Sequence, residues 1–459
     1  MSSLPAQRAR PLPVLMRVSA YAAMAVAFGL AGWFVAGVSD EVLVPVTTVL
    51  SLAGALALTL FSLRTGTLAS PLALLGVPLL LSLAAAMQPI TRIFAEWSPE
   101  SLSAVVLIVL APLIGVGAAM LVTSAGLPRM QLGTAALPYP SRLIAVCLLM
   151  CIVGTASYAF EWSTIGGPPL LSSNIDKTRF AVEFGALHVF TQGLPLALLI
   201  GTWARVARPG CFTAPQRRVL EAIMCFVPLI LVLNGGRGPV LVPLIMALVV
   251  AGRYVSARAA RRMLIVIPIA ILMFSSAMFL VRVEQRAPTG VIGSVLYNDT
   301  GAKSSPLASA YRSVSIGLGE QLRVIAELRA ADVRTPPFTS SIWFAHNFTS
   351  RAVDPGSITA PNAGGWITAT YAGPVLLDFG LLPALLFGFG LGAVAYVLYV
   401  HFARGRSVAI LWIYAYVAGQ LAFAFYVNIF LQFFFPFLDL IALVILSRLL
   451  IKPGPLAAP

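Results

Sequence analysis

The chain has 459 residues, of which 59% are hydrophobic and only 10% are charged, and its mean hydropathy is +0.93. Soluble globular domains carry roughly 25% charged residues, so this composition excludes a water-soluble domain. The formal net charge of +14 does not indicate a nucleic-acid partner, because the basic residues are spread over short loops instead of forming one patch.

Apolar runs recur along the chain at the length that an α-helix needs to cross a hydrocarbon core about 30 Å thick. The run over 42–63 is apolar on all faces, which favours helices over strands of alternating polarity. The first run, 18–38, exceeds the apolar core of a secretory signal, so we expect it to remain as a signal anchor. The fold class is therefore all-α, a polytopic helical membrane protein of about twelve spans. The predicted spans are 18–38, 42–63, 69–87, 102–124, 142–162, 180–203, 217–234, 238–252, 263–281, 381–402, 408–427 and 429–451.

The charge pattern predicts how these spans are oriented. If the arginine-rich N-terminus is cytoplasmic, alternation places most basic residues inside, as the positive-inside rule requires. Both termini are then cytoplasmic, and one large loop lies outside the cytoplasm. The predicted units are a bundle of nine spans over 1–281, an extracytoplasmic loop with short helices over 282–370, and a bundle of three spans over 371–459. The basic residues placed inside are Arg8, Arg10, Arg17, Arg64, Arg129, Arg142, Arg205, Arg208, Arg217, Arg218, Arg253, Arg258, Arg261, Arg262, Arg404, Arg406, Arg448 and Lys452.

Three arginines lie at the predicted outer membrane boundary. Arg179 enters the sixth span, Arg237 stands in a glycine-rich turn between the seventh and eighth spans, and Arg282 closes the ninth span. A charge at that depth is costly unless it reaches the interface, pairs or binds an anion. A guanidinium suits a phosphate because it can donate two parallel hydrogen bonds. The three arginines are candidate phosphate ligands, and the alternative for each is a simple interfacial anchor.

The turn around Arg237 is the most specific of the three. Gly235, Gly236 and Gly238 leave the backbone open to the close approach of a ligand, and Pro239 suits the first position of the eighth span. The N–H groups and the positive end of that helix would then face outward. The sequence therefore predicts a small anion cradle at this turn.

Two segments of the chain resemble a known family. Residues 233–241, Leu-Asn-Gly-Gly-Arg-Gly-Pro-Val-Leu, are similar to the Ser-Arg-Gly-type segment of bacterial O-antigen polymerases and ligases. Residues 362–380, Asn-Ala-Gly-Gly-Trp-Ile-Thr-Ala-Thr-Tyr-Ala-Gly-Pro-Val-Leu-Leu-Asp-Phe-Gly, resemble the stretch after the long periplasmic loop of Wzy-type oligosaccharide repeat-unit polymerases. Arg179 followed by Gly185 fits the arginine and glycine that such polymerases show ahead of these motifs. The resemblance covers about 175–450, whereas the first five spans match only as generic membrane helices.

This resemblance implies a GT-C-like glycosyltransferase of the bacterial plasma (inner) membrane with a periplasmic large loop. Its donor would be a glycan linked to a polyprenyl diphosphate such as undecaprenyl diphosphate, and its acceptor a sugar hydroxyl on another lipid-linked repeat unit. A regulator of chain length would be a further partner. Related enzymes are similar to metal-independent inverting transferases, so we expect neither a cofactor nor a metal. Arginines would stabilise the departing diphosphate electrostatically.

Nine residues are candidates for the site. Asp378 lies at the outer boundary ahead of the tenth span, and its alternative role is a helix N-terminal cap. His346 is the loop histidine, Asn362 stands where the polymerase pattern prefers asparagine, and aromatic rings suit sugar faces. The catalytic candidates are Arg179, Arg237, Asp378 and His346, and the substrate-binding candidates are Arg282, Arg286, Asn362, Trp366 and Tyr371.

Other polar residues near the outer face are weaker candidates. Glu161, Asp176, Glu183 and Asp354 are acids within reach of it. His188 is predicted about 13 Å inside the sixth span at 1.5 Å per residue, where it would hydrogen-bond within the bundle or line a cavity.

Three functions from different classes remain open at this stage. A repeat-unit polymerase is the leading prediction. A glycan ligase would use the same donor, but Asn362 replaces the histidine that ligases tend to show there. A lipid or polysaccharide transporter is less consistent with the sequence, because we find no internal repeat and the candidate groups gather at one face.

Overall fold

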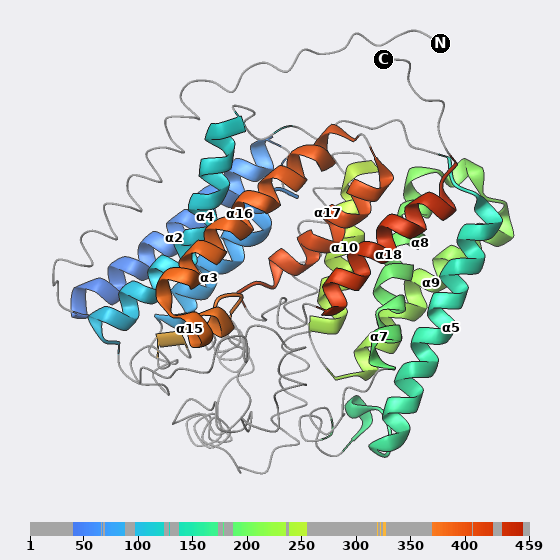
Figure 1. Cartoon of the computed structure of the whole chain (residues 1–459), viewed down its shortest axis with the longest axis horizontal. Coiled ribbons are helices and arrows are strands. Elements are labelled where there is room, and N and C mark those ends of the chain that lie inside the picture. The colour runs from blue at the N-terminus through green and yellow to red at the C-terminus, as the bar shows by residue number, and fades with distance from the viewer. Residues whose placement is uncertain are drawn as a thin grey trace, which may run out of the picture.

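Helices account for nearly all of the structure, which is a computed structural model. It describes residues 40–65, 67, 69–87, 97–123, 128, 137–172, 178, 187–235, 238–254, 319, 322, 325–326, 370–405, 407–425 and 434–452. Where these residues cover a predicted span, they are mostly helical (Figure 1), although 102–124, 180–203, 408–427 and 429–451 are covered only in part. The first and ninth predicted spans, 18–38 and 263–281, lie outside the described residues. The all-α prediction is therefore confirmed for the described part of the chain.

Several of the described helices contain a proline within their length. Pro45, Pro112, Pro228 and Pro243 lie inside helices, as membrane spans tolerate. The described elements are α2 (Asp40–Thr65), the π-helical turn η1 (Leu72–Gly76), α3 (Val77–Ala86), α4 (Pro99–Thr123), α5 (Pro140–Thr164), η3 (Pro169–Leu171), α7 (His188–Thr191), α8 (Gly193–Ala207), η4 (Pro209–Cys211), α9 (Ala214–Leu233), α10 (Gly238–Tyr254), α15 (Gly373–Phe379), α16 (Leu381–Arg404), α17 (Val408–Ala422) and α18 (Phe434–Leu450).

Five helical segments of the described residues are long and apolar enough to cross a membrane. Three shorter helices are also apolar, namely Leu72–Ala86, Gly238–Tyr254 and Val408–Ala422. Large apolar side chains are exposed on the outer surfaces of several helices, including Leu56 on α2 and Ile152 on α5, which suits contact with lipid. The protein is thus a membrane-embedded helical protein. The five long segments are Val44–Arg64, Glu100–Thr123, Pro140–Thr164, His188–Ala207 and Leu381–Arg404.

Charges are segregated between the two ends of the bundle. The ten lysine and arginine residues that the structure describes lie in the last turns of α2, α8, α10, α16 and α18, in the first two turns of α5 and α9, or just after α8 and α18. These helix ends are uppermost in Figure 1, and we call this end of the bundle the basic end. Of the described acidic side chains, only Glu221 lies toward this end, and Glu100, Glu161, Asp378 and Asp439 lie in the other half. This asymmetry agrees with the positive-inside rule on which the predicted orientation rests. We call the other end of the bundle the opposite end.

Direct contacts join helix ends that the predicted alternation of the spans places on the same side of the membrane. Arg253 near the end of α10 donates to the carbonyl of Phe402 in the last turn of α16. The amide of Tyr139, just before α5, donates to the carbonyl of Leu450 at the end of α18 at 2.8 Å. Each contact joins two helix ends that are predicted to lie on the same side of the membrane. The packing is therefore consistent with the predicted alternation of the spans.

The closest crossing in the bundle is between α4 and α16, and glycine makes it possible. A Cβ atom added at Gly115 would lie 2.0 Å from the carbonyl oxygen of Phe389, and one at Gly392 would lie 1.9 Å from the carbonyl oxygen of Pro112. Membrane helices associate through such small residues because they let two backbones approach. The α4–α16 contact therefore requires glycine at both positions.

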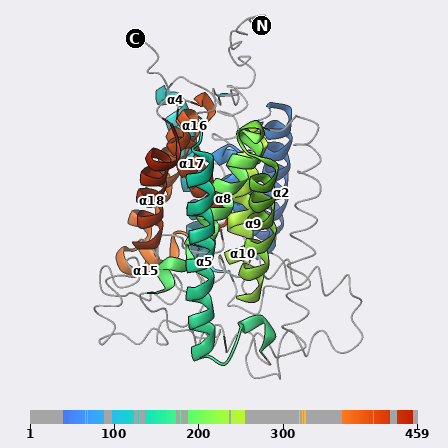
Figure 2. The same ribbon diagram turned by 90° about the vertical axis from the view of Figure 1, so that its right-hand side faces the viewer.

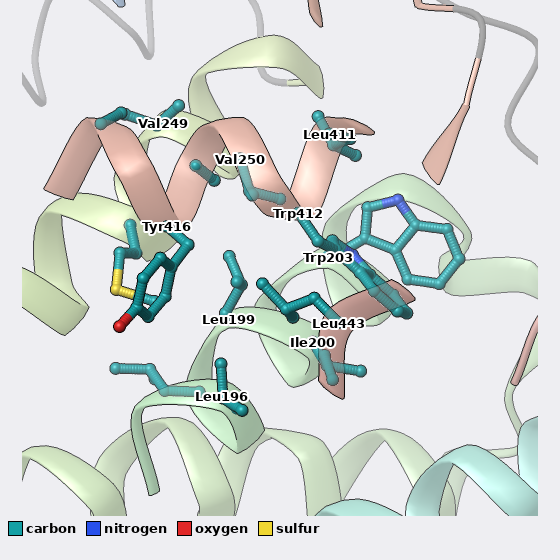
Figure 3. Close-up of a cluster of buried hydrophobic side chains, with 14 of the residues drawn as sticks. Leu196, Leu199, Ile200, Trp203, Val249, Val250, Leu411, Trp412, Tyr416 and Leu443 are labelled. Atoms are coloured by element: carbon teal, nitrogen blue, oxygen red, sulfur yellow. The ribbon is translucent and has the colours of Figure 1, made fainter. Parts of the chain in front are cut away.

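Glycine also allows close approach at two further helix crossings. A Cβ at Gly154 of α5 would lie 2.8 Å from Leu194 Cγ of α8, and one at Gly419 of α17 would lie 2.9 Å from the carbonyl oxygen of Val242 in α10. Around these crossings, the core of the second half of the bundle forms between α8, α10, α17 and α18 (Figure 3). Its largest pair is Trp203 and Trp412, whose rings meet edge to face with centroids 5.4 Å apart. These contacts fix how each helix is rotated about its own axis.

Candidate functional site

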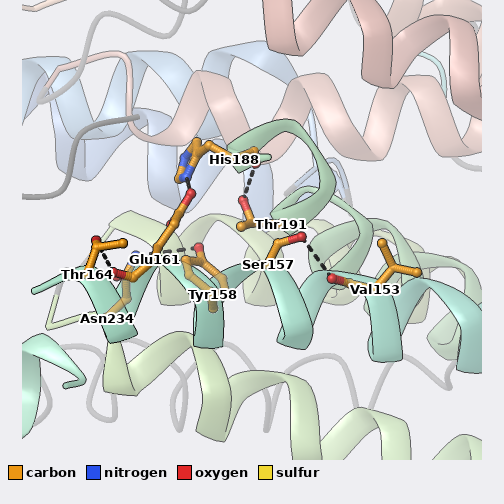
Figure 4. Close-up of polar contacts among 8 residues, drawn as sticks. All are labelled: Val153, Ser157, Tyr158, Glu161, Thr164, His188, Thr191 and Asn234. Atoms are coloured by element: carbon orange, nitrogen blue, oxygen red, sulfur yellow. Dashed lines mark hydrogen bonds and ion pairs between the residues drawn. The ribbon is translucent and has the colours of Figure 1, made fainter. Parts of the chain in front are cut away.

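Polar side chains gather where α5, α7 and α9 meet at the opposite end of the bundle (Figure 4). Glu161 lies in the last turn of α5, and His188 is the first residue of α7. The His188 Nδ1 atom is 2.9 Å from the Glu161 Oε1 atom, and the two residues are only 8% and 5% exposed. A carboxylate and an imidazole are thus held together in a largely dehydrated setting, where such pairs interact more strongly than in water.

Three more side chains complete this group. Tyr158 stacks on Trp162 with ring centroids 5.4 Å apart, and it meets the His188 ring edge-on at 6.3 Å. The side-chain amide of Asn234, the residue after α9, donates to the Tyr158 hydroxyl at 3.4 Å. We call these five residues, Tyr158, Glu161, Trp162, His188 and Asn234, the polar cluster. It connects the ends of three helices that are far apart in sequence.

The local sequence explains why α5 can present this group. Tyr158, Glu161 and Trp162 follow a spacing of three and four residues, which places them on one face of a helix. Nearby hydroxyls bond within their own helices instead: Ser157 donates to the Val153 carbonyl at 3.0 Å, and Thr191 donates to the His188 carbonyl at 2.6 Å. These two hydroxyls therefore donate to backbone carbonyls and not to the carboxylate or the imidazole.

The height of the polar cluster follows from the length of α5. This helix has 25 residues, or about 37 Å at 1.5 Å per residue, so it exceeds a hydrocarbon core of about 30 Å. Figure 2 shows that its lower end extends beyond α10. Glu161 lies three residues before the end of α5, and His188 is bonded to Glu161. The predicted hydrogen bond of His188 within the bundle is confirmed, and its depth of about 13 Å in the membrane stays a prediction.

The polar cluster leads directly into the glycine-rich turn. Asn234 is followed by Gly235, whose φ of 69° is the left-handed conformation that glycine adopts without strain. The Gly235 amide donates to the Val232 carbonyl at 2.9 Å, which ends α9. The next helix, α10, begins at Gly238, where an added Cβ would meet nothing within 4 Å. Only Gly236 and Arg237 separate these two described glycines in the sequence, so the polar cluster is three residues from Arg237 along the chain.

Two of the nine predicted site residues belong to the described part of the chain, namely Asp378 and Tyr371. Neither belongs to the polar cluster: Asp378 lies in α15, and Tyr371 lies two residues before that helix. The other seven predicted site residues, which lie outside the described residues, are Arg179, Arg237, Arg282, Arg286, His346, Asn362 and Trp366.

Tyr371 is fully buried at the turn before α15. Its hydroxyl donates to the Ile108 carbonyl of α4 at 2.5 Å, and its ring stacks with Phe387 of α16. A Cβ at Gly388 would lie 2.5 Å from this hydroxyl, so glycine makes room for it. Burial raises the pKa of the Tyr371 phenol, which therefore stays protonated as a hydrogen-bond donor at neutral pH. In this conformation no face of the ring is open, and sugar stacking by Tyr371 stays a prediction.

Asp378 is buried, with 6% of its surface exposed, in the last turn of α15. The following helix, α16, has Gly380 at its N-terminal cap position, with a φ of 86° and no side-chain cap bond. The alternative role of Asp378 as the N-terminal cap of that span is therefore wrong. The short helix α15 ends at Phe379, directly before Gly380.

A second buried polar pair lies between α17 and α18. The Tyr416 hydroxyl donates to the Asp439 Oδ2 atom at 2.6 Å, and both side chains are buried. Sequence reasoning did not select Asp439, although an acid ten residues inside the predicted span 429–451 is a signal by itself, since charges within spans are costly. The Glu161–His188 pair was harder to foresee because its members are 27 residues apart and belong to different helices.

The described residues contain no group of three or more His, Cys, Asp and Glu side chains that could hold a metal ion. Comparisons with known proteins add no relative: no protein-family model, no curated protein and no solved structure matches this chain. The resemblance to Wzy-type polymerases therefore rests on the sequence segments alone.

Proposed function

We propose that this protein is a bacterial membrane glycosyltransferase that polymerises polyprenyl-diphosphate-linked oligosaccharide repeat units at the outer face of the plasma membrane. In this proposal the chain has twelve spans and a GT-C-like fold. The observation that carries the proposal is the position of the polar cluster. It lies at the end of the bundle opposite the basic end and leads, through Asn234 and Gly235, into Arg237.

The chemistry follows from where such a substrate would lie. A polyprenyl tail fixes its diphosphate at headgroup height, which is the predicted height of Arg179, Arg237 and Arg282. Guanidinium groups bind phosphate oxygens in pairs of parallel hydrogen bonds, and they stabilise the charge that develops as the diphosphate leaves. The acceptor hydroxyl displaces the diphosphate from the anomeric carbon in one step, which inverts the configuration there. No metal ion is required if arginines neutralise the leaving group.

The test uses the full chain reconstituted in lipid vesicles, with lipid-linked repeat units extracted from the producing cells. We expect a ladder of lengthening products, and we expect Arg237→Ala and Arg179→Ala to slow elongation at least about 100-fold, as for loss of one transition-state donor. The control is Arg64→Ala, because Arg64 is exposed near the end of α2 at the basic end. Elongation should also persist in a metal chelator.

The outcomes separate the three functions. Wild-type chain length in both Arg179→Ala and Arg237→Ala would contradict the proposed role of the arginines. Transfer of the glycan only to an acceptor that is not a lipid-linked repeat unit would identify a ligase. Movement of the lipid-linked unit across the vesicle membrane without any elongation would identify a transporter.

A further inference from the structure

The proposed function leaves the acceptor hydroxyl without a base, and the polar cluster contains a pair suited to that task. We propose that His188 is the general base that accepts the proton of the acceptor hydroxyl and that Glu161 is its positioning residue. This inference rests on the proposed glycosyl transfer. It assigns to the Glu161–His188 pair a substrate class, namely the sugar hydroxyl of the incoming repeat unit.

The geometry of the pair fixes which ring nitrogen does the chemistry. The Glu161 carboxylate lies 2.9 Å from Nδ1 of His188, so the tautomer that satisfies both groups carries its proton on Nδ1 and donates it to the carboxylate. Proton exchange with a substrate then takes place through Nε2. A carboxylate that orients an imidazole in this way also stabilises the imidazolium once a proton has been accepted.

The surroundings of the imidazole favour this role over a solvated surface pair. His188 and Glu161 are both buried, and Figure 4 shows the imidazole directed toward the Glu161 carboxylate. From α5 the titratable neighbours are Glu161 and Tyr158, while α9 contributes the neutral amide of Asn234 through Tyr158. An imidazole is the side chain that most often transfers protons near neutral pH.

The polar cluster also connects the Glu161–His188 pair to the segment that precedes Arg237, the predicted ligand of the leaving group. Asn234 bonds to Tyr158, whose ring contacts His188, and Arg237 follows Asn234 by three residues. The polar cluster thus joins the turn that carries the predicted phosphate ligand to the pair that would accept the proton. A displacement reaction needs these two groups on the two sides of one anomeric carbon.

The proposed step conserves atoms and electrons. The acceptor oxygen forms a bond to the anomeric carbon while its proton passes to Nε2 of His188. The bond between the anomeric carbon and the diphosphate oxygen breaks, and its electron pair leaves with the diphosphate. The imidazolium, paired with Glu161, then releases its proton to water, which restores the pair for the next addition.

The experiment compares single-turnover elongation by purified full-length variants in lipid nanodiscs, with extracted lipid-linked repeat units as donor and acceptor. We expect His188→Gln to lower the rate of the chemical step by about 10²- to 10⁴-fold, because this is the usual contribution of a general base. The donor concentration that gives half-maximal rate should change little. Ser157→Ala is the matched control, because that hydroxyl lies one turn from Glu161 and bonds only within α5.

The pH profile distinguishes a base from a merely structural pair. The wild-type rate should fall on the acid side, where the imidazole is protonated before it meets the substrate, and His188→Gln should lose this dependence. Glu161→Gln should lower the rate of the chemical step, because the imidazole loses the carboxylate that orients it. Glu161→Asp should recover part of the rate.

Failure of this inference is distinct from failure of the proposed function. If the wild-type protein does not elongate the glycan, the glycosyltransferase proposal fails. If the wild-type protein elongates it and His188→Gln does so at the same rate with the same pH profile, His188 is not the base. A lower yield of folded His188→Gln protein with an unchanged rate and pH profile per folded molecule would also overturn the inference, since it would assign the pair to helix packing alone.

Discussion

Replacing Gly392 by alanine should separate α4 from α16, and Gly390, two residues earlier on the same helix, provides the control. A Cβ at position 392 would lie 1.9 Å from the Pro112 carbonyl oxygen, whereas ordinary contacts begin near 3.4 Å. The two backbones must therefore move apart by about 1.5 Å at their crossing. At Gly390 an added Cβ meets nothing within 4 Å.

The magnitude follows from two opposing terms. Forcing an extra methyl group into a close-packed contact costs about 1–3 kcal/mol. A gap of even about 0.5–1 Å also removes a quarter to a half of the dispersion energy of the atoms that line it. Alanine in place of an exposed helical glycine contributes about 1 kcal/mol of helix propensity in the favourable direction. Both variants gain this helix propensity, so the steric cost alone separates them. The free energies of unfolding of Gly392→Ala and Gly390→Ala should thus differ by roughly 1–3 kcal/mol.

The assay is denaturation of the purified protein in micelles by increasing sodium dodecyl sulfate, followed by tryptophan fluorescence. We expect Gly392→Ala to unfold at clearly lower denaturant than wild type, and Gly390→Ala to unfold at the same or a slightly higher concentration. Equal midpoints for the two variants would refute the reasoning, because the crossing geometry alone distinguishes the two glycines.

Two further buried hydrogen bonds give predictions for the same unfolding assay. Tyr416→Phe should lower the free energy of unfolding by about 1–3 kcal/mol, because it removes the donor to Asp439 Oδ2. A double-mutant cycle with Asp439→Asn should show coupling between the two positions, and strictly additive effects would count against the contact. Tyr371→Phe should cost about 1 kcal/mol through loss of the bond to the Ile108 carbonyl. Tyr371→Ala should cost about 3–5 kcal/mol because it also empties a fully buried site, and wild-type stability in this variant would show that the site is not packed as described.

The sequence predicted the helices well because the signal for a membrane span is local. The expected span 142–162 is found as Pro140–Thr164, and 381–402 is found as Leu381–Arg404, since apolar length alone decides which residues can stay in lipid. The order of helix ends was also predictable, because it depends on counting spans and on the placement of Arg and Lys. Both signals need no knowledge of which helix touches which.

The candidate site was predicted less completely. The turn at Asn234 and Gly235 was expected from its glycines. The N-terminal cap role of Asp378 was wrong because α15 continues through Asp378 and leaves Gly380 to begin α16.

By itself, the sequence of this protein determined its membrane class, the spans that the structure describes and the charge difference between the two ends of the bundle. Each of these properties depends on the free energy of single side chains or short runs in lipid, which neighbouring helices change little. Only the tertiary structure decided that Glu161 meets His188, that Tyr416 meets Asp439 and that Gly392 meets the backbone of α4. These pairings depend on how each helix is rotated about its axis, and packing between segments far apart in sequence sets that rotation.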